Sequence, residues 1–505
     1  ADSVLTSKGD IALTAAQKAD LDGRINADGA LSVTADALLT RETSQLQSTG
    51  DLTLKATGDA RLEGTHAGKG KMAVDAQTIA HKGKSAAAAI DLKAGSFLEN
   101  SGTLVGDTLA LKGDQISNSG LLKGTDRLTL EGNTLDNLTG GTLYGGDLTF
   151  NGGTLSNSGV IAADKQMTLQ AGALNNTGEI KAQTLDVEAD SLTNNGTLLG
   201  SERLTLNGGQ ITQQQDGKLM SGGDLRLQAA GLNALGQIIA IGDLALTLAD
   251  TLSNQATMVA GKSLTINSGG GLDNQGRMQG QSLELNAVGR LANGGDITVG
   301  KGRTALSGGD IVINDGGSLQ SGGNITLSSL SNITVNGFIG SPGNLTLSAP
   351  GSILNTALLY AANNMALYAD RITNQRGEML AGNNLTLQRD AEGHANTEVV
   401  NTSGTIETQK GDITINTGRF LNTREGFVVS TSNKTYVNSP AATITVRASS
   451  LDSKEVYYYT WERCRGGGRN GADESCDTMY SVLPIPDVSI KNIPISEKVT
   501  TVSAE

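Results

Sequence analysis

The sequence has 505 residues and a formal net charge of −13, and its 67 glycines contrast with 6 prolines and an aromatic content of 3%. A core so poor in aromatic side chains must be built from Leu, Ile, Val and Ala. The acidic balance excludes nucleic acid or an anionic bilayer as a partner of the whole surface, because both reward clustered Lys and Arg. No run of about 20 apolar residues is present, so we expect no membrane-spanning segment.

The N-terminus reads ADSVLTSKGDIAL, without an initiator Met or the architecture of a signal peptide. We interpret the chain as an internal fragment or a processed form. Missing targeting segments therefore carry no information about where the parent protein works.

Two phrases alternate along most of the chain. The first is apolar-x-Asn-x-Gly-x-apolar, and Gln213 and Ala234 fill two places in its series before Asn374 resumes it. The second is Leu-Thr-Leu or a variant, with weaker upstream copies from Ile11. Clear copies of the second phrase begin at these residues: Leu109, Leu128, Leu148, Met167, Leu185, Leu204, Leu225, Leu244, Leu264, Leu283, Ile325, Leu345, Met365 and Leu385. With a blurred copy near Thr304, the spacing is about 20 residues, which is typical of a solenoid.

Within each copy the apolar residues alternate with polar ones, which predicts short strands with one face inward. Leu128 and Leu130 should point inward and Thr129 outward. Helical repeats would need three- and four-residue spacing, and the longer signature of leucine-rich repeats is absent. The sequence therefore predicts an all-β fold, a right-handed parallel β-helix of roughly 20 rungs. Its length should be about 95 Å at about 4.8 Å per rung.

The Asn of the first phrase should stack in equivalent turns and hydrogen-bond along the rod as a ladder. We also expect Asn-Gly to be used because it tolerates positive φ. The predicted ladder comprises Asn100, Asn118, Asn137, Asn157, Asn176, Asn194, Asn254, Asn274 and Asn293. The Gly-Asp-apolar corners are interpreted as turns, since the Gly-Gly-x-Gly-x-Asp repeat of calcium-binding rolls is missing. We therefore predict no metal and no cofactor.

After Leu385 the phrasing loosens, and an insertion or irregular rung delays the next strand to Ile413. Beyond Pro440 the composition changes to proline and aromatic residues. We divide the chain into a β-helical filament at 1–430 and a non-repeat segment at 431–505. The segment should form a strand, a loop and a return strand, with a local disulfide between Cys464 and Cys476 in an oxidising compartment. A free or metal-binding pair of cysteines is the alternative.

The aromatic residues of the non-repeat segment allow two interpretations. They could form a small core that covers the open end of the solenoid, since uncovered sheet edges are avoided. Alternatively, some are contact residues for another macromolecule, because Tyr, Trp and Arg lead at binding hot spots. The candidates for receptor binding are Tyr457, Tyr458, Tyr459, Trp461, Arg465 and Arg469.

Catalytic motifs are weak throughout. Gly466, Gly468 and Gly471 satisfy Gly-x-Gly-x-x-Gly literally, but no βαβ unit surrounds them. The three histidines His66, His81 and His394 occupy separated places, without the spacing of a metal site or a triad. A polysaccharide lyase or hydrolase would need paired acids beside aromatic platforms, and the repeats have few aromatics. We therefore predict that the chain is not an enzyme.

The alternation of the two phrases over residues 10–425 resembles the haemagglutinin repeats of filamentous-haemagglutinin-type exoproteins of Gram-negative bacteria. These are the large partners in two-partner secretion. The break into aromatic sequence is most similar to the order found in contact-dependent growth inhibition effectors (CdiA type), where a receptor-binding region follows the first repeat block. The alternative within the resemblance is a filamentous adhesin that binds host glycans or proteins.

The resemblance implies a monomeric, non-catalytic stalk that presents the start of a receptor-binding region to neighbouring bacteria. The implied partners are an outer-membrane protein or lipopolysaccharide receptor on target bacteria, and a cognate outer-membrane β-barrel transporter. The transporter would act on an N-terminal domain that this sequence does not include. The parent protein would be secreted, anchored at the outer membrane and displayed at the cell surface.

Overall fold

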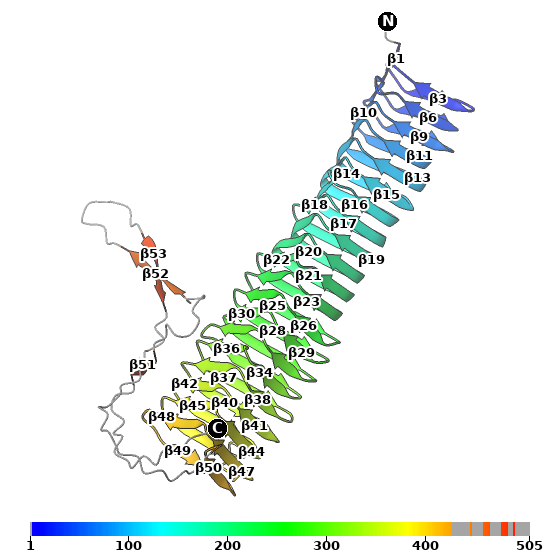
Figure 1. Ribbon diagram of the computed structural model, residues 1–505. Coiled ribbons are helices and arrows are strands. Elements are labelled where there is room, and N and C mark those ends of the chain that lie inside the picture. The colour runs from blue at the N-terminus through cyan, green and yellow to red at the C-terminus, as the bar shows by residue number, and fades with distance from the viewer. Residues whose placement is uncertain (1–2, 427–444, 447–457, 465–475, 483–487, 490–505) are drawn as a thin grey trace, which may run out of the picture. The chain divides into compact units, whose positions relative to one another are not determined.

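The computed structural model describes residues 3–426 and the backbone of short strands at 445–446, 458–464, 476–482 and 488–489. The chain divides into two units, Ala1–Thr423 and Arg424–Glu505. The described residues of the first unit form a parallel β-solenoid of about 21 turns, whose stacked strands run from blue to yellow in Figure 1. The predicted all-β solenoid is thus confirmed.

Each turn of the solenoid has three sides. Side 1 carries the Leu-Thr-Leu phrase, side 2 ends at the Asn of the other phrase, and side 3 follows the Asn-Gly corner. The separate strands of side 1 are β2 (Ile11–Thr14), β5 (Leu31–Ala35), β8 (Leu52–Ala56), β25 (Leu244–Leu248), β28 (Ser263–Ser268), β31 (Ser282–Ala287), β34 (Thr304–Gly308), β37 (Ile325–Ser329), β40 (Leu345–Ser348), β43 (Met365–Tyr368), β46 (Leu385–Gln388) and β49 (Ile413–Ile415).

The strands of sides 2 and 3 stack in the same way. Those of side 2 are β3 (Lys18–Leu21), β6 (Ala37–Thr40), β9 (Asp59–Leu62), β15 (Gln115–Asn118), β26 (Leu252–Asn254), β29 (Leu272–Asn274), β32 (Leu291–Asn293), β35 (Ile311–Ile313), β38 (Ile333–Val335), β41 (Ser352–Asn355), β44 (Arg371–Gln375), β47 (Glu398–Thr402) and β50 (Phe420–Thr423). Those of side 3 are β1 (Val4–Ser7), β4 (Arg24–Ala27), β7 (Gln45–Ser48), β10 (Thr65–Gly68), β12 (Lys84–Ala86), β18 (Val160–Ala163), β22 (Lys218–Ser221), β24 (Gln237–Ala240), β27 (Thr257–Ala260), β30 (Arg277–Gly280), β33 (Asp296–Val299), β36 (Ser318–Ser321), β39 (Phe338–Ser341), β42 (Leu358–Ala361), β45 (Glu378–Ala381) and β48 (Thr405–Thr408).

Between residues 71 and 234 most strands run through the corners, so that one strand serves two or three sides. These long strands are β11 (Lys71–His81), β13 (Ala89–Asn100), β14 (Thr103–Lys112), β16 (Leu121–Asn137), β17 (Thr142–Asn157), β19 (Gln166–Asn176), β20 (Glu179–Asn194), β21 (Thr197–Gln213) and β23 (Asp224–Ala234). The turn-to-turn register is parallel, as in β16 and β17, where Leu128 lies beside Leu148 and Leu130 beside Phe150.

The core is a set of aliphatic columns that run the length of the solenoid. Leu128 and Leu130 are fully buried, whereas Thr129 between them faces outward and is only partly covered. Phe150 is a rare aromatic among the buried side chains. The alternation of inward and outward residues predicted from the sequence is therefore correct, and burial of aliphatic surface on every turn stabilises the rod.

The glycine of the Asn-x-Gly corner is required for a reason other than the expected positive φ. Gly178 and Gly196 do not have positive φ. A Cβ on Gly196 would lie 2.1 Å from the carbonyl oxygen of Gly178, one turn earlier. Backbones in successive turns approach so closely at this corner that no side chain fits between them.

The insertion expected after Leu385 is a loop of residues 389–397 between β46 and β47. The turn that contains it is longer than the others, since Asn374 and its partner Asn401 are 27 residues apart. The strands nevertheless return to register, and β49 pairs with β46 from Ile413, as predicted.

The second unit contributes two small antiparallel pairs. β52 (Tyr458–Cys464) pairs with β53 (Cys476–Val482), and β51 (Thr445–Val446) pairs with β54 (Val488–Ser489). The predicted boundary at 430/431 lies outside the described residues. In the part of the chain that the structure describes, no helix is long and apolar enough to cross a membrane.

Candidate functional site

A chain of hydrogen bonds between buried side chains runs through the rod where side 2 ends. Nδ2 of Asn100 donates to Oδ1 of Asn118 at 2.7 Å, and Nδ2 of Asn118 donates to Oδ1 of Asn137 at 2.8 Å. Nδ2 of Asn118 also donates to the carbonyl oxygen of Gly120 at 3.1 Å. The bond from one amide to the next recurs at 2.8–2.9 Å along Asn137, Asn157, Asn176, Asn194 and Gln213. These buried amides are therefore satisfied, as burial requires.

The same column holds two further pieces of this asparagine chain. One joins Asn254, Asn274 and Asn293 at 2.7 Å, and another joins Asn355, Asn374, Asn401 and Asn422 at 2.8–2.9 Å. Apolar side chains separate the pieces: Ala234, Ile313 and Val335, each fully buried. The register of the strands does not change at these breaks.

Two of the histidines lie together inside the rod, which corrects the expectation that all three are separate. His81 precedes Asn100 by one turn, and its Nδ1 lies 2.7 Å from Oδ1 of Asn100. Ser85 Oγ lies 2.9 Å from Nε2 of His81 and 2.9 Å from Nδ1 of His66. Nε2 of His66 lies 2.8 Å from Oγ1 of Thr40. The two rings meet because adjacent sides of adjacent turns face one interior, and their centroids are 6.3 Å apart.

Both of these histidines are uncharged at neutral pH. Burial, and then the neighbouring His81, lower the pKa of His66 to about 3. Burial lowers the pKa of His81 to about 4, although its hydrogen bond with Asn100 acts in the opposite direction. Removing an imidazolium from water costs free energy, so the neutral form is favoured. We call His66, Ser85 and His81 the His–Ser–His cluster.

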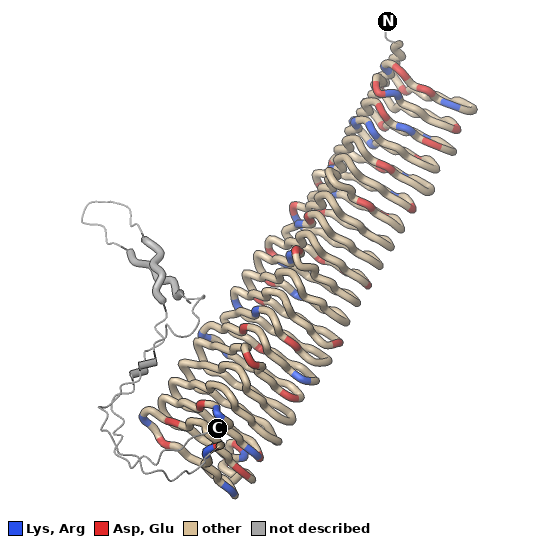
Figure 2. The backbone as a smooth tube through the Cα atoms, viewed as in Figure 1, with Lys and Arg blue, Asp and Glu red and all other residues tan. Residues whose placement is uncertain are grey.

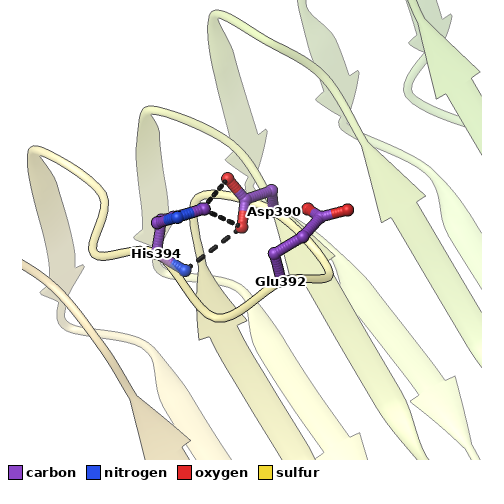
Figure 3. A group of neighbouring side chains, drawn as sticks. All are labelled: Asp390, Glu392 and His394. Carbon is purple, nitrogen blue, oxygen red and sulfur yellow. Dashed lines mark hydrogen bonds and ion pairs between the residues drawn. The ribbon is translucent and has the colours of Figure 1, made fainter.

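The third histidine lies in the loop of residues 389–397 (Figure 3). Nδ1 of His394 lies 2.8 Å from Oδ2 of Asp390, and ligand atoms of Asp390, Glu392 and His394 lie within 4.8 Å of one another. Partial burial would raise the pKa of Asp390, but hydrogen bonds from the amide and imidazole of His394 more than offset it and leave the pKa lowered. Two carboxylates and an imidazole could hold a divalent cation. The same contacts between Asp390 and His394 also close the loop as ordinary hydrogen bonds.

Charged residues of both signs are scattered along the backbone of the rod, as Figure 2 shows. A surface hollow of about 410 Å³ at the corner between sides 3 and 1 contains Asp126, Asp147, Asp164, Arg127 and Lys165. A hollow of about 570 Å³ near Gln210 has Asp250 as its single ionisable lining residue. Neither contains a histidine or an aromatic side chain.

The corner residues do more than make turns. Oδ1 of Asp51 accepts a hydrogen bond from the backbone N–H of Lys71 at 2.8 Å, and Oδ1 of Asp243 accepts one from the backbone N–H of Ser263 at 3.1 Å. Asn replaces Asp toward the C-terminus, and Oδ1 of Asn324 accepts the amide of Asn344 at 2.8 Å. A second, external series of hydrogen bonds therefore joins successive turns along this corner.

The candidate contact residues of the non-repeat segment are only partly within the described residues. Tyr458, Tyr459 and Trp461 lie on β52, whereas Tyr457, Arg465 and Arg469 lie outside the described residues. The antiparallel register places Cys464 opposite Cys476. Opposed residues of antiparallel strands have the Cα separation that a disulfide needs, and the disulfide itself stays a prediction.

Comparison with known proteins gives the family. The haemagglutinin-repeat model matches residues 145–183, 182–241, 200–276, 280–337 and 329–439, which together exceed half of the chain. The chain belongs to the haemagglutinin-repeat family. Its repeats are the stacked turns described above, and this β-helix is a structural stalk region.

Three of the relatives that match this chain carry different names. Deoxyribonuclease CdiA of Dickeya dadantii (strain 3937) is 33% identical over 429 residues, 80% of this chain and 13% of the relative. tRNA nuclease CdiA of Escherichia coli (strain STEC_O31) is 36% identical over 261 residues, 50% of this chain and 8% of the relative. 16S rRNA endonuclease CdiA of Enterobacter cloacae subsp. cloacae is 35% identical over 307 residues, 57% of this chain and 9% of the relative.

This haemagglutinin-repeat chain is thus a CdiA-like protein of the filamentous-haemagglutinin type. It spans about a tenth of the length of the curated relatives it matches. No solved structure matches it significantly.

Proposed function

We propose that the chain is the cell-surface stalk of a Gram-negative contact-dependent growth inhibition effector, and that it extends and presents a receptor-binding region to neighbouring bacteria. The rod supplies distance: about 21 turns at about 4.8 Å each span about 100 Å. The non-repeat residues 431–505 supply the start of the contact surface.

One observation supports most directly the assignment of a non-catalytic role to this chain. Relatives named as a deoxyribonuclease, a tRNA nuclease and an rRNA endonuclease match 50–80% of this chain at 33–36% identity. An activity that differs between them is not encoded by the part they have in common. The shared stretch therefore serves the step common to all three, and the described rod offers a repeating, mainly aliphatic scaffold for it.

The proposed partners follow from the same assignment. An outer-membrane protein or lipopolysaccharide on the target cell would contact the non-repeat segment, and an outer-membrane β-barrel transporter would export the parent protein. The exported protein would stay anchored at the outer membrane. Within this chain, Tyr458, Tyr459 and Trp461 stand on a strand of the second unit, and such residues lead at binding hot spots.

Binding of the full chain to Gram-negative cells tests the proposal. Replacing Tyr459 and Trp461 by Ala should reduce binding by at least about tenfold, since hot-spot truncations cost about 2 kcal/mol. The matched control is Tyr360→Ala, which removes an aromatic side chain from the outer surface of side 3 of the rod.

A second comparison tests the predicted disulfide. Cys464→Ser/Cys476→Ser should weaken cell binding while the β-sheet circular dichroism of the rod stays unchanged. If Tyr360→Ala lowers binding while the variants of the non-repeat segment do not, the shaft carries the contacts. The protein would then act as an adhesin along its length.

A further inference from the structure

The orientation of the buried amides is fixed by backbone groups that cannot reverse their roles. Nδ2 of Asn100 lies 3.4 Å from the carbonyl oxygen of Gly102 and 2.7 Å from Oδ1 of Asn118. Further along, the amide N–H of Gly159 donates to Oδ1 of Asn157. A carbonyl only accepts and a backbone N–H only donates, so every Oδ1 in the series faces the N-terminal end of the rod. Oδ1 of Asn100 therefore faces His81 and accepts.

This orientation determines the tautomer of both histidines. Because Oδ1 of Asn100 accepts, Nδ1 of His81 carries the hydrogen, and Nε2 of the neutral ring must accept from the hydroxyl of Ser85. With its hydrogen so used, Ser85 Oγ accepts from Nδ1 of His66, whose Nε2 accepts from the hydroxyl of Thr40. One unidirectional chain of hydrogen-bond donors therefore runs from Thr40 through the His–Ser–His cluster to the amides of the asparagine chain.

An added proton has no place in this chain. A proton on Nε2 of His81 turns that atom into a donor, so that two N–H groups converge on Ser85 Oγ and the serine hydroxyl loses its acceptor. A proton on Nε2 of His66 likewise turns that atom into a donor toward Thr40 Oγ1, and the threonine hydroxyl loses its acceptor. Buried donors without acceptors are costly, and low polarity around them increases the cost.

No buried counter-charge offsets the proton. The strands against the two rings are β6, β7, β9, β10, β11, β12 and β13, and apart from the two histidines their buried side chains are uncharged. In the described part of the rod no Asp, Glu, Lys or Arg is buried. The charged residues on these strands are exposed or half-buried on the outside: Asp59, Arg61, Lys71, Asp75, Lys84, Asp91, Lys93 and Glu99.

We propose that the His–Ser–His cluster is an acid-sensitive connection. It joins the first turns of the rod to the asparagine chain at neutral pH and releases these turns below about pH 5. Their release follows from the opening of the turns around the His–Ser–His cluster, within residues 37–118. The turns of Asn254, Asn274 and Asn293 and those beyond contain no buried ionisable group among their described residues and keep their structure.

The sign follows from linkage. The unfolded chain binds protons at histidine with an ordinary pKa of about 6.5, whereas the folded rings stay neutral down to about 4 and about 3. The contribution is fully present above pH 6.5 and is lost as the pH falls from 6.5 toward 4. Between those values each histidine raises the opening equilibrium constant of its turns, on the order of 100-fold by pH 4.5.

Hydrogen exchange of the full chain tests the proposal, measured by mass spectrometry at pH 7.5 and 4.5 and corrected for intrinsic exchange rates. Amides of residues 59–100 should lose protection on acidification, while those of residues 264–293 should not. The informative variant is His66→Leu/Ser85→Leu/His81→Asn. It continues the columns of its neighbours, since His66 and Ser85 lie between Leu46 and Leu104, and His81 precedes Asn100.

This variant should fold and lose the acid response, whereas His394→Asn, which removes an exposed histidine, should keep it. His81→Asn alone should remove about half of the response on a logarithmic scale, which covers the case in which the triple variant does not fold. The proposal is overturned if the wild-type turns around the His–Ser–His cluster show no extra exchange at pH 4.5. It is also overturned if the variants that lack histidines of this cluster respond to acid as the wild type does.

Discussion

Two stretches of the rod differ in what fills the column at the end of side 2. From Asn100 to Gln213 every turn places an amide there, and the amides bond continuously. From Ile313 to Val335 the same column is aliphatic and fully buried. The strands keep the same parallel register through both stretches.

The break is tolerated because each piece of the asparagine chain ends on backbone groups. Nδ2 of Asn293 donates to the carbonyl oxygens of Gly295 and Ser318, each at 3.0 Å, and so needs no further amide. At the start of the next piece, the amide N–H of Ala357 lies 3.4 Å from Oδ1 of Asn355. The aliphatic columns therefore determine the fold, and the asparagine chain fixes polar groups that the fold would otherwise bury unpaired.

The largest expected effect is common to both stretches. Leu204→Asp and Ile333→Asp each remove a fully buried aliphatic side chain and bury a charge, so each should cost more than about 4 kcal/mol of unfolding free energy. The outward controls Thr205→Asp and Thr334→Asp should cost less than about 1 kcal/mol. Chemical denaturation measures all four. Equal tolerance at inward and outward positions would contradict the column assignment.

An amide within the continuous stretch should matter less than a core leucine. Asn157→Leu leaves Oδ1 of Asn176 without its donor and removes a donor to the carbonyl oxygen of Glu179. An unsatisfied buried acceptor costs about 1–3 kcal/mol, and we expect a loss of that size in thermal unfolding. An unchanged midpoint would mean that the amides contribute nothing that leucine cannot replace.

The converse substitution should be milder still. Ile313→Asn/Val335→Asn would bridge Asn293 to Asn355 and make one series of amides from Asn254 to Asn422. Lost aliphatic burial opposes the new hydrogen bonds, so the net cost should be below about 1 kcal/mol per site. A loss as large as that of Ile333→Asp would show that the aliphatic stretch cannot accept amides.

The smallest effect is expected on the outside. Nζ of Lys112 lies 2.6 Å from Oε1 of Glu131 on the next turn, and more than half of each side chain is exposed. Exposed ion pairs contribute about 0–1 kcal/mol. Lys112→Ala should therefore lower the unfolding free energy by a few tenths of a kcal/mol, which corresponds to a shift of the unfolding midpoint of about 1 °C. A larger shift that persists in 1 M salt would contradict a purely electrostatic role.

The sequence predicts the repeating parts of this molecule well, because each is written many times. The roles of Leu128, Leu130 and the Asn-x-Gly phrase are visible because these patterns recur. Even the delayed strand at Ile413 keeps the apolar-Thr-apolar pattern of side 1. The His–Ser–His cluster occurs once. His66 and His81 are 15 residues apart, and only the register between turns shows that His81 occupies the asparagine column and that Ser85 reaches both rings.

The corner glycines illustrate a second limit. Their recurrence is visible in the sequence, but the reason is not: Gly196 is needed for its approach to Gly178 O, whereas we expected a need for positive φ. The cluster of Asp390, Glu392 and His394 was likewise missed, because a single insertion has no neighbouring copy with which to compare it.

The claim that the turns supply length can be tested by removing whole turns. Deleting residues 195–293 joins Asn194 to Gly294 and removes the five register steps through Gln213, Ala234, Asn254, Asn274 and Asn293. Small-angle scattering of the folded deletion variant should show a maximum dimension shorter by about 24 Å, at about 4.8 Å per turn, with cell binding unchanged. A folded, shortened protein that no longer binds target cells would contradict the account, because it would place the contacts on the turns themselves.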